Sequence, residues 1–338
     1  MKILMIILSH LLGVIALVSC SNVPANAQTA HHDFAIENVG DGIYVHHGVH
    51  MDIDDGYKGD ICNASFVVGN KGVAVIDTGG SIKVGNQLRD AIKKVTDKPI
   101  LYVINTHVHP DHIYGNAAFL ADKAEFIGHE KLATAMELRR EQYTKLNAKL
   151  LGDDAKGSEL IKPTIAVKTT LELDLGDRKL MLTAHPVAHT NTDLSVIDIK
   201  ADSKSSTLFT GDLLFIERTP VLEGDIKGLI TELEKLKSSA TNKAIKQIVP
   251  GHGPVTKDWK LAIENQQRYL TALLNDIRAS IKKGESMESA MNTAAASEKD
   301  KWQLFDIANR RNVNIIYPAL EWELMCCNPR VVPAEYTS

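Results

Sequence analysis

A dense cluster of metal-binding side chains constrains this chain more than any other feature. Three imidazoles and one carboxylate fall within six residues, in the spacing H-x-H-x-D-H: His107, His109, Asp111 and His112. They follow an apolar run, residues 100–104, whose length and β-branched content predict a short buried strand. Pro110 cannot continue such a strand, so we expect the cluster on a turn at the strand's carboxyl end.

The residue types in the cluster indicate a metal site. Three histidines and an aspartate are costly to crowd together unless a positive ion neutralises and coordinates them. Neutral imidazole nitrogen and carboxylate oxygen are ligands that zinc accepts. A solvated group of surface histidines is the alternative, and the partner residues found further along the chain disfavour it.

Length and charge limit the classes of function. With 338 residues the chain is long enough for one large core, or for a main domain with a smaller appendage. The net charge is -4 and aromatic residues make up 5%. A nucleic-acid-binding protein would show a basic stripe or a platform of aromatic side chains, so we expect no nucleic-acid partner and a small-molecule substrate instead. The sequence carries no signal for an oligomeric state.

The first residues predict export. Lys2 precedes an apolar stretch, residues 3–18, with the length of a secretory signal and short for a membrane-spanning helix. Leu-Val-Ser-Cys at 17–20 resembles a bacterial lipobox, which would make Cys20 a lipidated first residue. Ala-Asn-Ala at 25–27 is an ordinary cleavage site that would release a soluble protein. We slightly favour the lipoprotein interpretation, with residues 1–20 as signal peptide and 21–33 as a tether. Either cleavage predicts a periplasmic protein or a membrane-anchored lipoprotein; an uncleaved anchor fits less well.

Three further cysteines remain: Cys62, Cys326 and Cys327. An exported compartment permits disulfides, so Cys62 pairing with a C-terminal cysteine, a vicinal disulfide and free buried thiols all stay open. None of the three has metal-site spacing with the histidines.

Short apolar segments alternate with turns and helical patterns from residue 34 onward. We expect strands at 43–46, 65–68, 72–77, 100–104, 125–128, 171–175, 179–183, 194–199, 207–210 and 245–249. We expect helices at 84–94, 130–151, 226–236, 259–283, 285–296 and 302–327. Periodicity alone supports only a mixed α and β protein.

The polar loop at residues 46–57 is too long for a tight turn and contains glycine. His47, His50 or Tyr57 would contact a substrate if this loop overhangs the metal site. A solvated loop without such a role is the interpretation we favour.

The chain resembles the metallo-β-lactamase-fold hydrolases in five motifs, which appear in the order typical of that family. They are residues 73–79 (Val-Ala-Val-Ile-Asp-Thr-Gly), the metal cluster, 188–190 (Ala-His-Thr), 210–212 (Thr-Gly-Asp) and 250–254 (Pro-Gly-His-Gly-Pro). The resemblance implies an α/β fold, a four-layer αββα sandwich over residues 34–258. Residues 259–338 would be a C-terminal helical extension; in glyoxalase II such a domain helps to bind the thioester substrate.

The resemblance also implies a ligand set for two zinc ions, with iron or manganese as alternatives. His107, His109 and His189 would hold one ion, and Asp111, His112 and His252 the other, with Asp212 bridging them. A hydroxide shared by the two ions would attack the substrate, and Asp111 would orient it or accept its proton. Residues that support the ligands without binding metal would be Asp77, Thr106, Asn116 and Thr190. His129 and His185 are expected to be structural histidines.

Departures from the family pattern exclude some members. β-Lactamases with a cysteine ligand carry it where this chain has Asp212, so lactamase activity is disfavoured. Flavo-diiron proteins have glutamate in place of His109, so a di-iron redox site is disfavoured. The nucleases of the superfamily insert a large domain between the last two ligands, and this chain has no such insertion, so a nuclease is disfavoured too. Residues 190–193 (Thr-Asn-Thr-Asp) replace the Pro-Gly turn that often follows His189.

The chain most resembles the quinoprotein relay system zinc metallohydrolase (SoxH-related) group, on residues 187–196, 210–220 and 304–313. That group is associated with exported dehydrogenases that depend on pyrroloquinoline quinone (PQQ). We therefore expect an exported binuclear zinc hydrolase of an ester, thioester or lactone, with a functional link to a quinoprotein dehydrogenase. Two alternatives stay open: a mononuclear iron enzyme like the persulfide dioxygenases, and a non-catalytic metal-binding accessory protein.

Overall fold

Two β-sheets bring the predicted ligands together from distant parts of the sequence. The computed structural model describes residues 34–201, 206–242 and 244–326. The first sheet has the order β1-β2-β3-β4-β5-β6-β7, and the second has the order β12-β11-β10-β9-β8. The strands are β1 (Glu37–Gly40), β2 (Ile43–His46), β3 (Ala64–Val68), β4 (Val73–Ile76), β5 (Ile100–Ile104), β6 (Glu125–His129), β7 (Ile165–Val167), β8 (Thr170–Asp174), β9 (Arg178–Ala184), β10 (Leu194–Lys200), β11 (Ser206–Phe215) and β12 (Ile245–His252).

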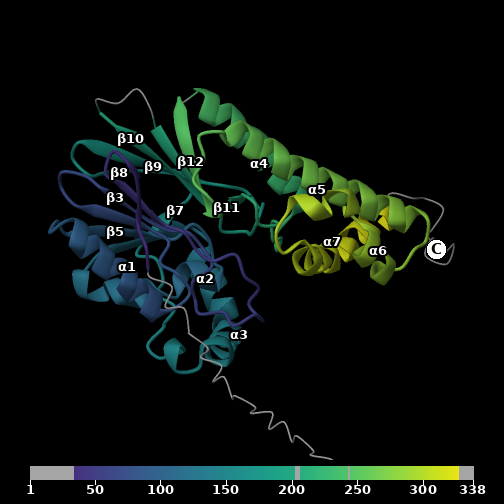
Figure 1. Ribbon diagram of the computed structural model, residues 1–338, viewed down its shortest axis with the longest axis horizontal. Helices are drawn as coiled ribbons and strands as arrows, with labels where there is room; N and C mark the ends of the chain where they lie inside the picture. The colour runs from purple at the N-terminus through teal and green to yellow at the C-terminus, as the bar shows by residue number, and fades with distance from the viewer. Residues whose placement is uncertain (1–33, 202–205, 243, 327–338) are drawn as a thin grey trace, which may run out of the picture. The chain divides into compact units, whose positions relative to one another are not determined.

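The helices lie on the outer faces of these sheets or beyond the second one (Figure 1). They are α1 (Ile82–Val95), α2 (Pro110–Ile113), α3 (Leu132–Leu151), α4 (Ile226–Asn242), α5 (Trp259–Lys282), α6 (Met287–Thr293) and α7 (Phe305–Cys326), with short 3₁₀ turns at Asn116–Asp122, Gly152–Ala155 and Ala296–Lys301. In the described part of the chain, none of these helices is both long and apolar enough to cross a membrane.

Three buried clusters define four layers. Leu88 and Ile92 of α1 pack on the outer face of the first sheet. Ile104 of β5 and Phe209 of β11 belong to the cluster between the sheets. Leu233 of α4 belongs to a third cluster, on the outer face of the second sheet. The αββα sandwich expected from the sequence is confirmed.

The C-terminal helices share this third cluster. Leu270 and Leu273 of α5 and Val313 of α7 are buried in the same group of residues as α4. The chain from Phe34 onward forms one compact unit. The helical extension is therefore packed through a continuous apolar core onto the second sheet.

Two strands run further than the sequence suggested, and both carry ligands. β11 was expected to end at residue 210 but continues to Phe215, and β12 was expected to end at 249 but continues to His252. The reason is that the two strands stay paired, with Gly211 opposite Pro250. A proline is tolerated there because β12 lies at the edge of its sheet. Strands β1 and β7 and the short helix α2 were not anticipated.

Several sequence expectations lie outside the described residues. They are the signal peptide, the tether, the possible lipidation at Cys20, and Cys327; for Cys326 only the backbone is described. Cys62 is a buried free thiol.

Candidate metal centre

The seven predicted ligands converge at one end of the two sheets. β5 leads into His107 and His109, and Pro110 then starts α2, whose first turn carries Asp111 and His112. Pro suits this position because the first helical N–H needs no partner within the helix. The other three come from the second sheet: His189 after β9, Asp212 in β11 and His252 at the end of β12.

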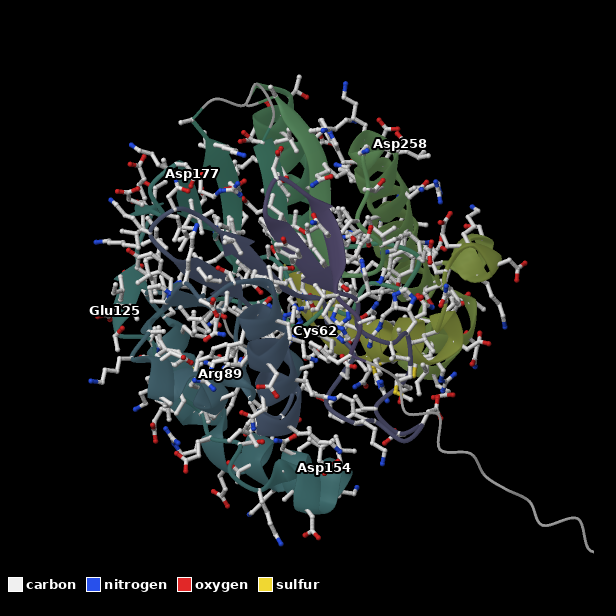
Figure 2. The ribbon with its side chains drawn as sticks, turned by 60° about the vertical axis from the view of Figure 1, so that its left-hand side comes forward. Cys62, Arg89, Glu125, Asp154, Asp177 and Asp258 are labelled. Carbon is white, nitrogen blue, oxygen red and sulfur yellow. The ribbon has the colours of Figure 1, made fainter. Side chains whose placement is uncertain are left out.

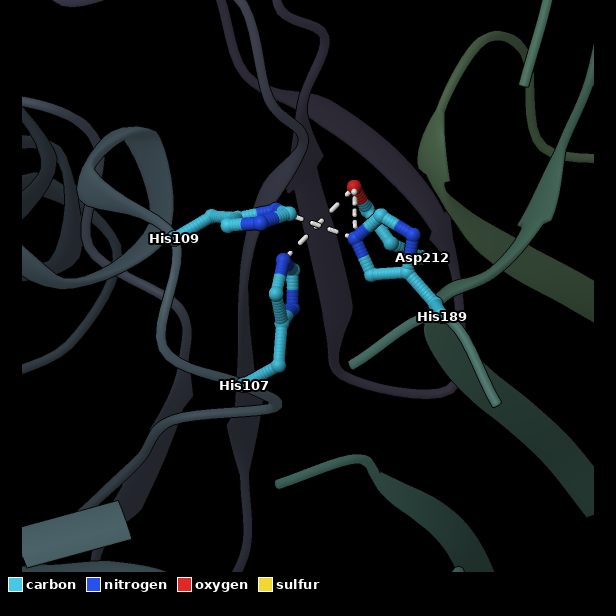
Figure 3. A group of neighbouring side chains, drawn as sticks. All are labelled: His107, His109, His189 and Asp212. Carbon is cyan, nitrogen blue, oxygen red and sulfur yellow. Dashed lines mark hydrogen bonds and ion pairs between the residues drawn. The ribbon is translucent and has the colours of Figure 1, made fainter. Parts of the chain in front are cut away.

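The first group contains three histidines and Asp212 (Figure 3). Nε2 of His189 lies 3.3 Å from Oδ2 of Asp212, and Nε2 of His107 lies 3.6 Å from the same oxygen. His109 differs, because its Nδ1 faces the group, 3.0 Å from Nε2 of His189. Ligand atoms around a tetrahedral zinc with bonds of about 2.0–2.1 Å are separated by about 3.3 Å. The spacing of the four atoms fits such an ion.

The second group contains Asp111, His112 and His252. Nε2 of both histidines lies 3.5 Å from Oδ2 of Asp111. Nε2 of His112 also lies 3.3 Å from Oδ1 of Asp212, and Nε2 of His252 lies 3.3 Å from Oδ2. Asp212 therefore stands between the two groups, with both within reach of its carboxylate.

Unsatisfied buried atoms indicate that these groups are built for cations. Nε2 of His107, Nε2 of His112 and Oδ1 of Asp212 are buried without a hydrogen-bond partner. Leaving buried polar atoms unpaired costs free energy unless something binds them. Because the three atoms belong to the metal-ligand set, a metal fits the residues present.

The protonation states of three of the ligands, His107, His189 and Asp212, agree with a metal site. Burial lowers the pKa of His107 well below its usual value and that of His189 to about 3, so both rings are neutral near pH 7. Burial alone would raise the pKa of Asp212, but the neighbouring imidazoles, His252 first, hold it well below its usual value. Neutral imidazole and ionised carboxylate are the forms that bind metal.

The expected supporting residues lie at different distances from the ligands. Asp77 accepts hydrogen bonds from the backbone N–H and Oγ1 of Thr106, and its Oδ2 lies 2.8 Å from Nδ1 of His112. Thr190 donates from N and Oγ1 to the Asp193 carboxylate, which fixes the turn after His189.

Within the described residues, Asn116 forms its side-chain hydrogen bonds with residues other than the ligands. Its amide bonds to Asn105, and it accepts from Thr78 Oγ1. The sequence expected Asn116 to support the ligands without binding metal, and it reaches them through Thr78, whose Oγ1 also donates to the carbonyl of His112. It holds together the turns that lead out of β4 and β5.

Glu223 was missed by sequence reasoning. Its Oε2 lies 2.6 Å from Nε2 of His109, the ring nitrogen that points away from the metal group, and its Oε1 pairs with Arg139 of α3. The bond to His109 and the pair with Arg139 hold the pKa of Glu223 at about 2. Carboxylates in this position orient a histidine ligand and raise its basicity. Glu223 lies in an irregular loop, and no motif points to it.

Two other histidines lie outside the ligand groups. His185 bonds through Nδ1 to Glu232 at 2.8 Å and through Nε2 to Ser195 at 2.7 Å. His129 accepts at Nδ1 from the backbone N–H of Lys131. Both are satisfied by protein partners, as the sequence favoured.

The thiol of Cys62 contacts the turn that carries Asp111. Cys62, labelled in Figure 2, is buried, and its Sγ donates to the backbone carbonyl of Asp111 over 2.9 Å. Burial raises the pKa of this thiol well above its usual value. Cys62 therefore supports the turn that carries Asp111, as a protonated donor.

The expectation of a solvated loop at residues 46–57 is wrong for Asp52 and Tyr57, although residues 54–56 are exposed. Tyr57 is buried against Ile61 and Leu151, and Asp52 is buried in a bidentate pair with Arg311. These packed side chains fix the loop to the rest of the fold. His47 is partly exposed and pairs with Glu37, and His50 is partly buried against Gln303.

The sequence from 57 to 254 matches the model of the metallo-beta-lactamase superfamily. This chain belongs to that superfamily. The matched residues include every predicted ligand. Membership supports a metal-dependent hydrolase in general terms, and the metal centre described above is the place where such chemistry would occur.

Solved structures share the fold. The inverting sec-alkylsulfatase Pisa1 from Pseudomonas sp. aligns with a TM-score of 0.61 and 15% identity, over 84% of this chain and 50% of that one. A metallo-beta-lactamase from Pontibacter korlensis aligns with a TM-score of 0.55 and 19% identity, over 70% of this chain and 98% of that one.

One curated protein is related over a short stretch. A linear primary-alkylsulfatase from Pseudomonas sp. is 38% identical over 53 residues, which is 16% of this chain and 10% of that protein. The chain thus spans about half the length of the sec-alkylsulfatase and matches a tenth of the primary-alkylsulfatase.

Proposed function

We propose that this protein is a binuclear zinc hydrolase that acts on an ester, thioester or lactone. The position of Asp212 carries the proposal. Its two carboxylate oxygens lie 3.3–3.6 Å from ligand nitrogens of both groups. A carboxylate placed in this way would be able to bind two neighbouring metal ions at once.

Two bound zinc ions would supply Lewis acidity and a water molecule of lowered pKa. The chain's residues would place the reaction around them. Asp111, at the open side of the second group with 15% of its side chain exposed, would orient the attacking water and accept its proton. Three other ligands are almost fully buried: His107, His189 and Asp212. They would hold the metal ions in a fixed geometry while the substrate is converted to product.

Alkyl sulfate esters are a second candidate substrate class. The structural alignment with the sec-alkylsulfatase covers 84% of this chain. It therefore extends beyond residues 57–254, which match the superfamily model. A relative with a stretch of 38% identity is named as a primary-alkylsulfatase. Both observations favour testing sulfate esters beside carboxylic esters, and neither assigns the activity.

An activity screen with the purified full chain tests the proposal. Aryl and alkyl esters, thioesters, lactones, primary alkyl sulfates and secondary alkyl sulfates are offered to the zinc-loaded protein. Asp212→Ala should abolish turnover of whichever class reacts, and Asp174→Ala, which changes an exposed aspartate of β8, should not. Turnover that survives Asp212→Ala would contradict the proposal.

Two outcomes would favour the alternatives. One iron per chain with oxidation of a persulfide and no hydrolysis would identify an enzyme like the persulfide dioxygenases. Two zinc ions without turnover of any class would favour a metal-binding accessory protein.

We also propose that the protein is exported and works beside a quinoprotein dehydrogenase. The apolar stretch at 3–18 and the two cleavage signals support export, and the resemblance of residues 187–196, 210–220 and 304–313 supports the link. Intact-mass analysis of the mature protein distinguishes a lipidated Cys20 from a chain that begins at Gln28. A mature chain that keeps Met1 and stays in the cytoplasm would contradict export.

A further inference from the structure

Three polar side chains form a buried chain outside the two ligand groups. His185 follows β9, Ser195 lies in β10 and Glu232 lies in α4. Nδ1 of His185 lies 2.8 Å from Oε2 of Glu232, and its Nε2 lies 2.7 Å from Oγ of Ser195. All three residues are buried. A carboxylate, an imidazole and a hydroxyl joined in this order are the parts of an activated serine nucleophile.

The proton positions in this chain suit a general base. Burial alone would raise the pKa of Glu232, but its bonds to His185 and Lys235 hold that pKa below its usual value. An ionised carboxylate can only accept hydrogen bonds, so Nδ1 of His185 carries the proton that it donates to Glu232. In the neutral ring, Nε2 is then the acceptor for the Ser195 hydroxyl. This is the tautomer that removal of the serine proton requires.

Ser195 faces a cavity beneath α4. Val196 belongs to the cluster between the sheets, and Ile197 belongs to the cluster on the outer face of the second sheet. Successive side chains of a strand alternate between its faces, so Ser195 points to the same outer face as Ile197. A cavity of about 270 Å³ is bordered there by Ser195, His185 and Glu232. The serine hydroxyl therefore has room for a reactant beside it.

The cavity wall favours a small uncharged group. Lys235 also lines the cavity, but its ammonium is paired with Glu232, so the described wall offers a ligand no free charge. Thr183 stands opposite Ser195 on β9 and lines the same cavity. Opposite side chains on one face of a sheet are about 4.5–5.5 Å apart, so the Thr183 hydroxyl can donate to a carbonyl oxygen held beside Ser195. The apolar part of the wall consists of Ala184, Pro186, Ile197, Leu208 and Leu236.

We propose that Ser195 is a second reactive site, separate from the metal centre, which accepts a short acyl group from an uncharged activated ester. Oγ of Ser195 bonds to the carbonyl carbon of the ester, and Nε2 of His185 takes the hydroxyl proton. The bond between that carbon and the leaving oxygen then breaks. The leaving oxygen receives the proton from His185 and departs as an alcohol. The products are one acyl-Ser195 per chain and one alcohol, so the step is a single acylation and adds no turnover to that of the metal centre.

Covalent labelling tests this site directly. Zinc-loaded full-length protein is incubated with p-nitrophenyl acetate and, separately, with diisopropyl fluorophosphate, whose phosphorus takes the place of the carbonyl carbon. Intact-mass analysis and peptide mapping should find one added group per chain, on Ser195. Ser195→Ala should lose the label. Ser280→Ala should keep it, because this buried serine of α5 donates to Glu285 and belongs to no such chain.

The same labelling separates a reactive chain from one that only connects α4 to the sheet. A purely structural chain leaves wild-type Ser195 unlabelled, and that result would overturn the proposal. Equal labelling of folded and urea-unfolded protein would overturn it too, because the geometry would then have no part in the reaction.

Glu232→Gln tests the role of the acid while keeping the side chain's shape. An amide can donate to Nδ1 of His185 and so favour the wrong tautomer. Labelling of Ser195 should therefore slow by at least about tenfold, within the roughly 10²–10⁴-fold that a positioned base contributes. An unchanged rate of labelling in Glu232→Gln would show that the acid and the imidazole do not activate the serine.

Variants of the metal centre separate this proposal from the hydrolase. Asp212→Ala and His252→Ala should both keep the label on Ser195, because the chain from Glu232 to Ser195 shares no residue with the ligand groups. Loss of the label in both variants would show that the reaction depends on the metal centre and would refute a separate site. If the zinc-loaded protein hydrolyses nothing but Ser195 is labelled, the proposed hydrolase fails and the reactive serine stands.

Discussion

At the scale of single residues, the ligands and the supporting Asp77 could be predicted, but the supporting Glu223 could not. His107, His109, Asp111 and His112 lie within six residues, so their spacing is itself the signal. Glu223 reaches His109 from a loop that the sequence does not distinguish from any other. The lesson is physical: a ligand must have a particular side chain, whereas its support needs only an acceptor that the fold brings close.

Glu223 should tighten metal binding through His109. Removing the charge by Glu223→Gln leaves a weaker acceptor for the ring proton and frees Arg139. Changes to such supporting carboxylates weaken metal affinity by about 10–100-fold. Competition of zinc with a calibrated chelator measures the effect, and Glu137→Gln, at an exposed glutamate of α3, is the control. Unchanged zinc affinity in Glu223→Gln would show that the carboxylate has no role at the metal.

Glu223 also predicts a pH dependence of folding for the metal-free protein. Its pKa is lowered to about 2 from an ordinary 4.5, so the folded state favours the ionised form. The stability it contributes is therefore fully present above about pH 5 and is lost as the pH falls from 4.5 toward 2. Urea unfolding of wild type and Glu223→Gln between pH 3 and 7 should show a difference that narrows as the pH falls. A difference that widens on acidification would contradict the lowered pKa.

At the scale of elements, two paired strands determine where the second sheet places its ligands. The sequence predicted β11 and β12 but ended both too early, because Gly211 and Pro250 are read as turn residues when their partners are unknown. The structure also explains why the motif at 250–254 has a glycine at position 251. A Cβ on Gly251 would lie 1.9 Å from Oδ1 of Asp212, so the glycine is needed for close approach.

Gly251→Ala should therefore displace Asp212 and release metal. We expect loss of at least one zinc ion from a protein that still folds. Gly72→Ala is a matched control, because its Cβ would also be crowded, at 2.6 Å from Leu101 and Pro99, far from the ligands in the fold. That variant should lose stability and keep its metal. Full zinc content in Gly251→Ala would show that the carboxylate tolerates the movement.

α4 is fixed to the second sheet by a buried polar chain, Glu232 to His185 to Ser195. His185→Ala leaves the carboxylate of Glu232 without this donor, so the free energy of unfolding should fall by roughly 1–3 kcal/mol. Metal content should not change, because His185 belongs to neither ligand group. Urea unfolding and elemental analysis measure the two effects. Loss of zinc from this variant would mean that the ligand set is wrong.

At the scale of the whole molecule, the order of motifs predicted the four-layer fold, while the surroundings of the site had to be observed. The loop at 46–57 reads as polar and solvated, yet Tyr57 and Asp52 are buried because distant segments, including Arg311 of α7, pack against it. Single-sequence patterns contain no record of such long-range partners. The sequence therefore predicted the metal ligands more completely than the contacts of the loop beside them.

The number of metal ions per chain tests the central claim most directly. Elemental analysis of the purified full-length protein should find two zinc ions per chain, and Asp212→Ala should retain at most one, because its carboxylate lies between the two groups. A single iron per chain, or two ions retained in Asp212→Ala, would contradict a binuclear centre bridged by Asp212.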